Sequence, residues 1–193
     1  MKSVRIIDDG RTVGLRAAYR RQGDFGTQGD WESLISSSTR EVDIMGRTTH
    51  GWTRSREVAD LIERKIIRDG VVFRWLIMAT DNKYLQLLTE EDINIGAMLK
   101  EKLTHVANFL QSIQSRLPKD KRELLQIRVF SHVPLYCGTV RVDDQIYVTP
   151  YLFSRSSDSS PLLVLEGRES AWVKTYVTEF ELESTCDSSP GTV

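Results

Sequence analysis

A short polar segment, Arg47-Thr48-Thr49-His50, combines a cation, two hydroxyls and an imidazole within four positions. It follows a predicted strand at Glu41–Met45 and precedes a helix that Ser55 is placed to cap. Ligands of open α/β sheets bind in this kind of link, outside the carboxyl end of a strand. Backbone N–H groups, the hydroxyls, Arg47 and His50 suit a phosphate or a carboxylate. There is no Gly-Lys-Ser/Thr sequence, so the segment is not a P-loop, and a plain polar loop that caps the helix is the alternative.

Three further candidate residues lie at the ends of two other predicted strands. Asp81 and Asn82 follow the strand Val71–Met78 and are suited to contact a ribose or a base, although both residue types are common turn formers. His132 ends a third strand, Leu124–Phe130, where it could act as an acid or base or serve only a structural role. If the strands are parallel, these side chains lie on the edge that carries Arg47.

The elements that must position these side chains begin with a βαβ unit. Val42 and Ile44 alternate with Glu41 and Asp43, which is typical of a strand. The helix Arg56–Arg68 has an apolar stripe, and Gly70 is placed to end it in the left-handed conformation. The nearly continuous apolar run Val71–Met78 then predicts a parallel strand that is buried on both faces.

The remaining pattern predicts a layered α/β/α domain with a mixed sheet. Further elements are expected at Glu90–Leu117 (helix), Leu124–Phe130, Thr139–Val142, Ile146–Val148 and Leu162–Leu165 (strands), and Ser170–Glu183 (helix). The domain is expected to span residues 30–184, after an irregular segment at 1–29. Within that segment, Val4–Ile7 could form a short strand, and Val13–Tyr19 could form another strand or a helix. A disordered tail is expected at 185–193.

The hairpin near residue 140 carries a family resemblance. Tyr136, Gly138 and Asp143 have the spacing of the His-x-Lys-x4-Asp motif of the phospholipase D superfamily. The segments at 41–46, 69–78 and 172–180 resemble the opening strand, the following strand and the last helix of those domains, in the same order. The ordered set resembles a single phospholipase D-like half-domain.

The resemblance implies a covalent phosphohistidine mechanism, whose residues this chain lacks. Tyr136 stands at the histidine position and Gly138 at the lysine position, and only Asp143 matches. We therefore expect a non-catalytic sensor or regulatory module that binds a phosphate-bearing small molecule or a protein partner. Arg141 and Asp143 are expected to lie beside the Arg47–His50 segment and to complete its ligand site.

Two alternatives remain open. One is a phosphodiesterase, or a hydrolase of nucleotides or phospholipids, of altered mechanism that uses His50 or His132 with Arg47 and Asp143. The other is an interaction module that forms a homodimer through the Leu99–Ile113 stripe or through the final aromatic helix, since phospholipase D-like half-domains commonly pair.

The overall composition limits the classes of partner and cofactor that we expect. The chain has 193 residues and a net charge of −1, so no overall field attracts it to nucleic acid. Cys137 and Cys186 do not have the spacing of a metal site, and no metal or cofactor is expected. No apolar stretch is long enough for a signal peptide or a transmembrane helix, so a reduced, cytoplasmic location is expected.

Overall fold

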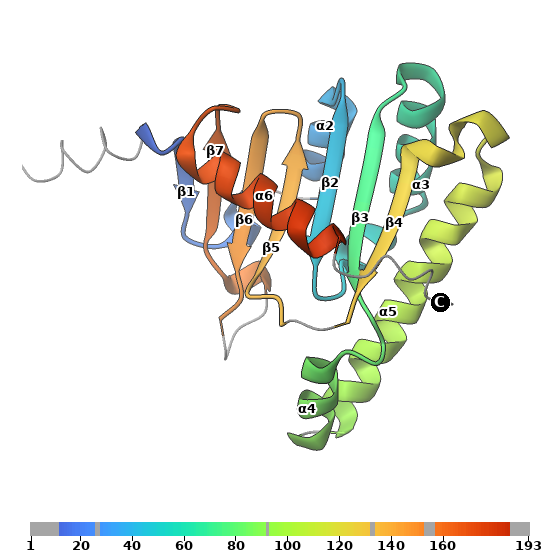
Figure 1. Cartoon of the computed structure of the whole chain (residues 1–193), viewed down its shortest axis with the longest axis vertical. Helices are drawn as coiled ribbons and strands as arrows, with labels where there is room; N and C mark the ends of the chain where they lie inside the picture. Colours follow the sequence, from blue (N-terminus) through green and yellow to red (C-terminus); the bar gives the residue numbers. More distant parts are fainter. Residues whose placement is uncertain (1–11, 26–27, 92, 132–133, 153–156, 186–193) are drawn as a thin grey trace, which may run out of the picture.

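The protein is described by a computed structural model for residues 12–25, 28–91, 93–131, 134–152 and 157–185. A seven-stranded sheet in the order β1-β7-β6-β5-β2-β3-β4 forms its centre (Figure 1). The strands are β1 (Leu15–Tyr19), β2 (Glu41–Gly46), β3 (Val72–Met78), β4 (Leu125–Phe130), β5 (Cys137–Val142), β6 (Gln145–Pro150) and β7 (Leu162–Glu166). Strands β2, β3 and β4 are parallel to one another, and the other neighbours in the sheet are antiparallel.

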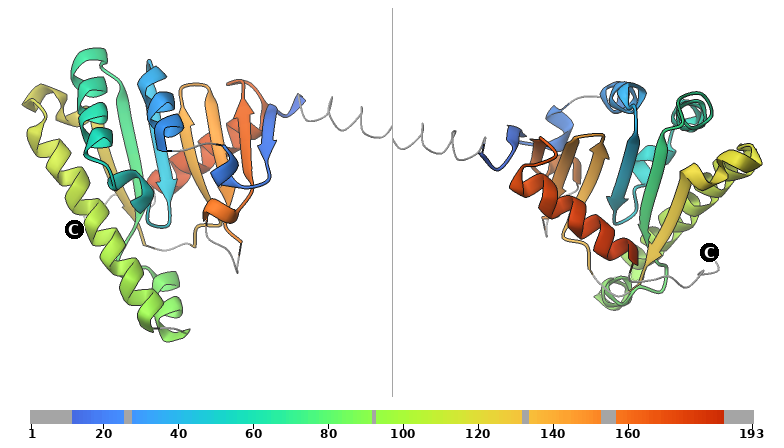
Figure 2. Two further views of the ribbon diagram at one scale, coloured as in Figure 1. Left: turned by 180° about the vertical axis from the view of Figure 1, so that it is seen from behind. Right: turned by 45° about the horizontal axis from the view of Figure 1, so that its top comes forward.

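Helices cover both faces of the sheet, which confirms the layered α/β architecture (Figures 1 and 2). One face carries α2 (Gln28–Ser37), α3 (Arg56–Arg64) and α5 (Ile93–Arg116), and α6 (Ala171–Thr185) crosses the other. Helix α4 (Lys83–Glu91) packs against α5. A π turn at Lys65–Asp69 extends α3, and short 3-10 turns lie at Gln22–Asp24, His50–Thr53, Lys119–Leu124 and Ser157–Ser159.

Local sequence signals explain the βαβ unit. The Ser55 hydroxyl accepts a hydrogen bond from the Glu57 N–H at 3.1 Å and so caps α3. Gly70 ends the π turn with φ of 67°, in the left-handed region that favours glycine. The register pairs Val42 with Phe73 and Ile44 with Trp75, so the parallel pairing predicted for these strands is confirmed.

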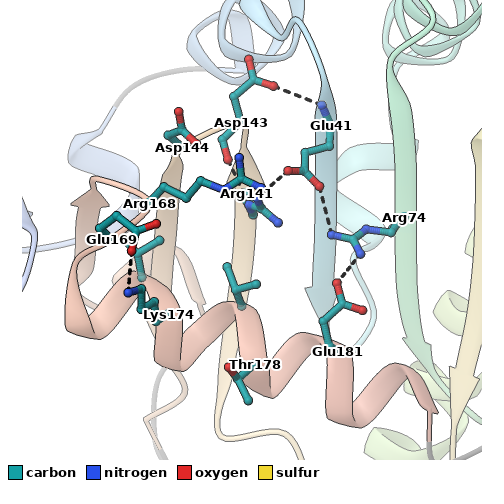
Figure 3. A pocket seen from close by; sticks show the side chains of 12 residues that line it. Glu41, Arg74, Arg141, Asp143, Asp144, Arg168, Glu169, Lys174, Thr178 and Glu181 are labelled. Atoms are coloured by element: carbon teal, nitrogen blue, oxygen red, sulfur yellow. Dashed lines mark hydrogen bonds and ion pairs between the residues drawn. The ribbon is translucent and has the colours of Figure 1, made fainter.

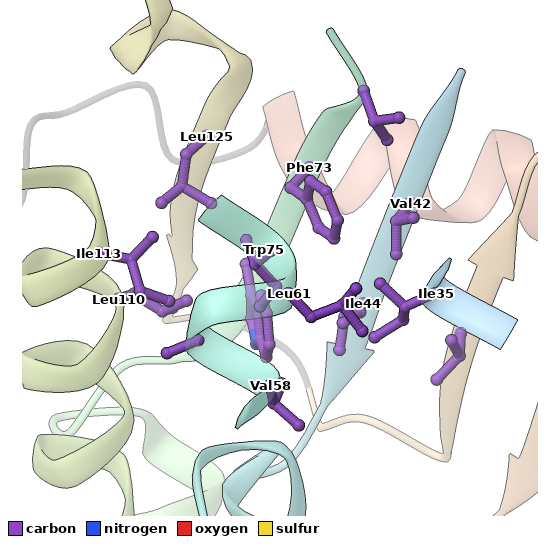
Figure 4. Packing of buried hydrophobic residues seen from close by; sticks show 14 of the residues in the cluster. Ile35, Val42, Ile44, Val58, Leu61, Phe73, Trp75, Leu110, Ile113 and Leu125 are labelled. Carbon is purple, nitrogen blue, oxygen red and sulfur yellow. The ribbon is translucent and has the colours of Figure 1, made fainter. Parts of the chain in front are cut away.

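The main core lies between the sheet and the α2, α3 and α5 layer (Figure 4). Trp75, Phe73 and Ile44 are almost fully buried there, and α5 contributes Leu110 and Ile113. Because the apolar stripe of α5 is used inside the domain, the dimer face expected at Leu99–Ile113 is wrong: four of its members, Leu103, Val106, Leu110 and Ile113, are almost fully buried.

Other expectations need correction. The segment expected to be irregular contributes β1, which pairs with β7, so the strand alternative at Val13–Tyr19 is confirmed. The helix expected from Glu90 begins earlier, as α4. The expected strand at Val4–Ile7 and nearly all of the expected tail lie outside the described residues.

Candidate functional site

The parallel strands have two ends, and polar side chains gather at both. Glu41 begins β2 and Gly46 ends it. At about 3.3 Å per residue, these ends are separated by about 17 Å. Because β5 runs antiparallel to β2, the start of β5 lies at the carboxyl end of β2, and the turn after β5 lies at its amino end.

Arg47 is the central charge of the carboxyl edge. Its guanidinium carbon lies 4.3 Å from the centre of the Tyr151 ring and 5.6 Å from that of Tyr84. Its Nε is buried and has no hydrogen-bond partner among the described residues, and Arg47 forms no ion pair with a carboxylate in that part of the chain. A guanidinium held by aromatic faces keeps its planar set of donors for an anion.

Tyr151 closes the space between β2 and β5. Its hydroxyl would lie 3.0 Å from a Cβ added at Gly46 and 2.8 Å from one added at Gly138. The Arg47 backbone N–H donates a hydrogen bond to this hydroxyl at 3.0 Å, and burial raises the pKa of Tyr151. The absence of side chains at Gly46 and Gly138 is therefore what makes room for the tyrosine.

The other side chains of the Arg47–His50 segment already contact neighbouring residues of the protein. Thr49 has φ of 50°, and its hydroxyl accepts a hydrogen bond from Trp75 Nε1 at 2.9 Å. The Thr48 hydroxyl lies 3.5 Å from the His50 N–H. The His50 ring contacts that of His105, and burial, followed by the charges of His105, Arg54 and Lys102, lowers the pKa of His50.

Of the candidates that follow β3, Asn82 has a side chain that serves local structure. Asn82 is fully buried, its carbonyl oxygen accepts from the Tyr84 N–H at 2.8 Å, and its amide lies 3.4 Å from the Phe130 carbonyl oxygen. Asp81 is exposed, and its backbone carbonyl accepts from the Gln86 amide. His132 lies outside the described residues.

The two residues that begin β5 differ in exposure. Tyr136 has 78% of its surface exposed, and its backbone carbonyl accepts from the Tyr151 N–H at 2.7 Å. Cys137 is half-buried, and burial, with the charge of Glu179, raises the pKa of its thiol to about 11. A thiol with this pKa is almost entirely protonated near neutral pH, which makes it a poor nucleophile.

Asp143 lies at the opposite end, in the turn after β5. One of its carboxylate oxygens accepts from the N–H and hydroxyl of Thr39, and the other accepts from the N–H groups of Arg40 and Glu41, at 2.9 to 3.1 Å. Burial raises the pKa of Asp143, but these hydrogen bonds outweigh it and leave the pKa below its usual value. The carboxylate thus fastens the chain that enters β2.

An ion network lies beside Asp143 and joins β2, β3, β5 and α6 (Figure 3). Arg74 donates to Asp43 at 2.6 and 2.7 Å and to Glu41 at 3.2 Å, and it also pairs with Glu181 of α6. Arg141 donates to Glu41 at 2.5 Å, to Asp43 at 3.2 Å and to the Asp143 carbonyl at 2.9 Å. Every guanidinium nitrogen of both arginines therefore donates at least one hydrogen bond.

A cavity of about 450 Å³ opens over this network. Arg168 and Lys174 lie at its lining together with Glu169, which pairs with Lys174 at 2.6 Å. Its buried charges already satisfy one another, so the cavity offers an incoming ligand mainly exposed side chains.

The predicted site residues therefore form two groups and not one. Arg47, Thr48, Thr49 and His50 lie together at the carboxyl edge, whereas Arg141 and Asp143 lie at the amino end of β2. The expectation that these two would neighbour Arg47 is wrong, because the hairpin register carries them away from it. Sequence reasoning missed Tyr84, Tyr151 and the Arg74 pairs. The one available signal was glycine at both Gly46 and Gly138, which leaves room for a large neighbour.

Among the described residues, no group of three or more histidine, cysteine, aspartate or glutamate side chains could hold a metal ion. None of the helices in that part of the chain has both the length and the apolar character needed to cross a membrane.

No family model matches the sequence, and no curated protein matches it. Phosphatidylserine synthase of Haemophilus influenzae Rd KW20 has a TM-score of 0.53 and 11% identity, over 86% of this chain and 37% of that chain. Nuc of Salmonella typhimurium, a phospholipase D family member, has a TM-score of 0.49 and 11% identity, over 86% of this chain and 93% of that chain.

TrmBL2, an archaeal chromatin protein that binds DNA, has a TM-score of 0.49 and 9% identity, over 94% of this chain and 58% of that chain. The chain thus spans less than two thirds of TrmBL2 and of the synthase. The mixed α/β sheet is similar to that of the synthase, and an identity this low indicates the fold alone.

Proposed function

We propose that this chain is a non-catalytic domain of phospholipase D-like fold that binds a phosphate-bearing small molecule at the carboxyl edge of β2 and acts as a sensor or regulatory module. The observation that carries the proposal is the Tyr151 hydroxyl, which fills the space in front of Gly138. In the resembled motif, position 138 belongs to a lysine that holds phosphoryl oxygens. Here no such side chain fits, and the exposed Tyr136 stands at the position of the nucleophilic histidine.

Arg47 supports the anion-binding part of the proposal. It is fixed by two aromatic rings, and its buried Nε has no partner among the described residues. A buried donor without a partner costs about 1 to 3 kcal/mol, so an anion that accepts its hydrogen bond would be bound favourably. The Arg47 donors and the polar loop after it suit a phosphoryl group.

The hydrolytic alternative loses support from the position of Asp143. A general acid or base must come within hydrogen-bond reach of its partner, and Asp143 lies at the far end of β2 from His50. Its carboxylate oxygens already accept four hydrogen bonds. His50 and Asp143 therefore cannot share one reaction within a single chain.

Thermal unfolding with inorganic phosphate, ribose 5-phosphate and a nucleoside monophosphate tests the proposal. We expect at least one of them to raise Tm in a saturable way, because a ligand that binds only the folded state stabilises it. R47Q is expected to lose that rise, whereas R168Q, which changes an exposed arginine at the other end of the strands, is expected to keep it.

The same preparations are assayed for hydrolysis of a chromogenic phosphodiester, and none is expected. Hydrolysis by the wild type that is lost in H50A would overturn the non-catalytic part of the proposal. The absence of any saturable rise in Tm, or a rise that R47Q leaves intact, would overturn the anion site.

A further inference from the structure

Helix α4 and the start of α5 form a hairpin that extends past the carboxyl ends of the strands (Figures 1 and 2). One side of α4 packs inward, where Leu85 is fully buried and Tyr84 is half-buried. Lys83, Leu87 and Glu90 are exposed, and Leu87 has 58% of its surface accessible. Their spacing of four and then three residues places them on one face of the helix.

This outward face has an apolar centre and opposite charges at its two ends. Leu87 lies near the middle of α4, with Lys83 at the first position and Glu90 in the last turn. Lys83 and Glu90 are seven residues apart, or about 10 Å along the axis, so they cannot pair within one helix. Neither makes an ion pair with another described residue.

The charge order of α4 is unfavourable for the helix alone. A helix amino end favours acidic side chains and a carboxyl end favours basic ones. Helix α4 has no acidic residue in its first turn and no basic residue in its last turn. An antiparallel helix of the same sequence would reverse this, because its Glu90 would lie beside Lys83 and its own Lys83 beside Glu90.

We propose that the outward face of α4 is a self-docking surface, on which a second copy of this chain binds antiparallel across a two-fold axis. Leu87 packs against Leu87 of the partner at the axis, and two Lys83–Glu90 pairs flank it. Ile93, with 72% of its surface exposed at the start of α5, adds apolar area at the hairpin. A contact centred on one short helix lies at the small end of specific interfaces, so the dimer is weak and reversible.

Sedimentation equilibrium of the full chain over about 1 µM to 1 mM, without phosphate, tests the proposal. We expect wild-type protein to dimerise reversibly, and L87E to weaken dimerisation by about tenfold or more, because it buries two like charges at the axis. L182E replaces a similarly exposed leucine on α6 and is the control that should leave dimerisation unchanged. Circular dichroism verifies that each variant is folded.

Reversing the charges at positions 83 and 90 tests whether the two α4 helices pair in the antiparallel direction. K83E and E90K each place like charges opposite one another and should each weaken the dimer, whereas K83E/E90K restores opposite charges and should recover it. A wild-type chain that is monomeric throughout, single reversals without effect, or a double variant that does not recover would overturn the proposal. R47Q should dimerise normally, so failure of the anion site leaves this outcome unaffected.

Discussion

The arginines at the two ends of β2 have opposite environments. At the amino end, Arg74 and Arg141 direct their donors to Asp43 and neighbouring acceptors beneath α6. At the carboxyl edge, Arg47 has aromatic rings as neighbours and no carboxylate among the described residues. Charges that satisfy one another hold a fold together, whereas a fixed charge with unused donors is suited to a ligand.

The largest effect is expected from breaking the amino-end network. R74M leaves the buried Asp43 carboxylate with fewer partners and should lower the free energy of unfolding by about 3 to 5 kcal/mol. R47M, the matched change at the other end, loses contact with the rings but also removes the unpaired buried Nε, so it should cost no more than about 1 kcal/mol. Urea unfolding of both variants measures the difference, and similar losses would contradict the contrast between the two ends.

A second test concerns the space that Tyr151 fills. In G138A the new methyl group would lie 2.8 Å from the Tyr151 hydroxyl, and we expect a loss of about 1 to 3 kcal/mol. Adding Y151F removes the hydroxyl, so the double variant should be more stable than the sum of the single changes predicts.

Gly51 provides a matched control for this test. A Cβ there meets nothing within 4 Å, so G51A should cost much less than G138A. If G138A were neutral, or if its effect and that of Y151F were additive, Tyr151 would not be what excludes a side chain at position 138.

A smaller effect is expected from Asp143. D143N keeps the shape of the side chain and suits its left-handed φ of 52°, but it loses the negative charge that the N–H groups favour. We expect a loss of about 1 kcal/mol at neutral pH, since this partly exposed site is screened by solvent.

The pH dependence of D143N gives the sign of this contribution. The pKa of Asp143 is lower in the folded protein than its usual value, so its contribution is present above the unfolded pKa of about 3.9. It disappears as pH falls through the folded pKa. The stability difference between wild type and D143N should therefore shrink below about pH 4, and a constant difference would contradict the account.

The smallest effect concerns His50, which is near Arg47. Because its pKa is lowered in the folded state, the unfolded chain binds the proton first, and stability should fall as pH drops below about 6.5. The groups that act on His50 are His105, Arg54, Lys102 and Glu101. Urea unfolding of H50Q should show a smaller drop between about pH 8 and pH 5 than wild type, and an equal drop would exclude His50 as its source.

Much of the fold could be predicted because its signals are local. The apolar run of β3, the cap at Ser55 and the left-handed Gly70 each depend on a few neighbouring residues. The sequence leaves β1 undecided between a strand and a helix, because its partner β7 lies about 150 residues away and supplies the pairing that its own short sequence does not indicate.

The site could be predicted only in part, for the same physical reason. The position of Arg47 after a strand identified it as a candidate, but its ring partners Tyr84 and Tyr151 come from distant segments. Asp143 was assigned to the wrong end of β2, since hairpin register rather than motif spacing fixes where its carboxylate lies.

The most direct test of the central claim is an NMR titration of the arginine side-chain Nε–H signals with inorganic phosphate. The proposed site predicts a saturable shift of the Arg47 signal, little change at Arg74 and Arg141, and no saturable shift of the remaining signals in R47K. A saturable response at Arg168 with Arg47 unchanged would move the anion site to the amino-end cavity and contradict the account.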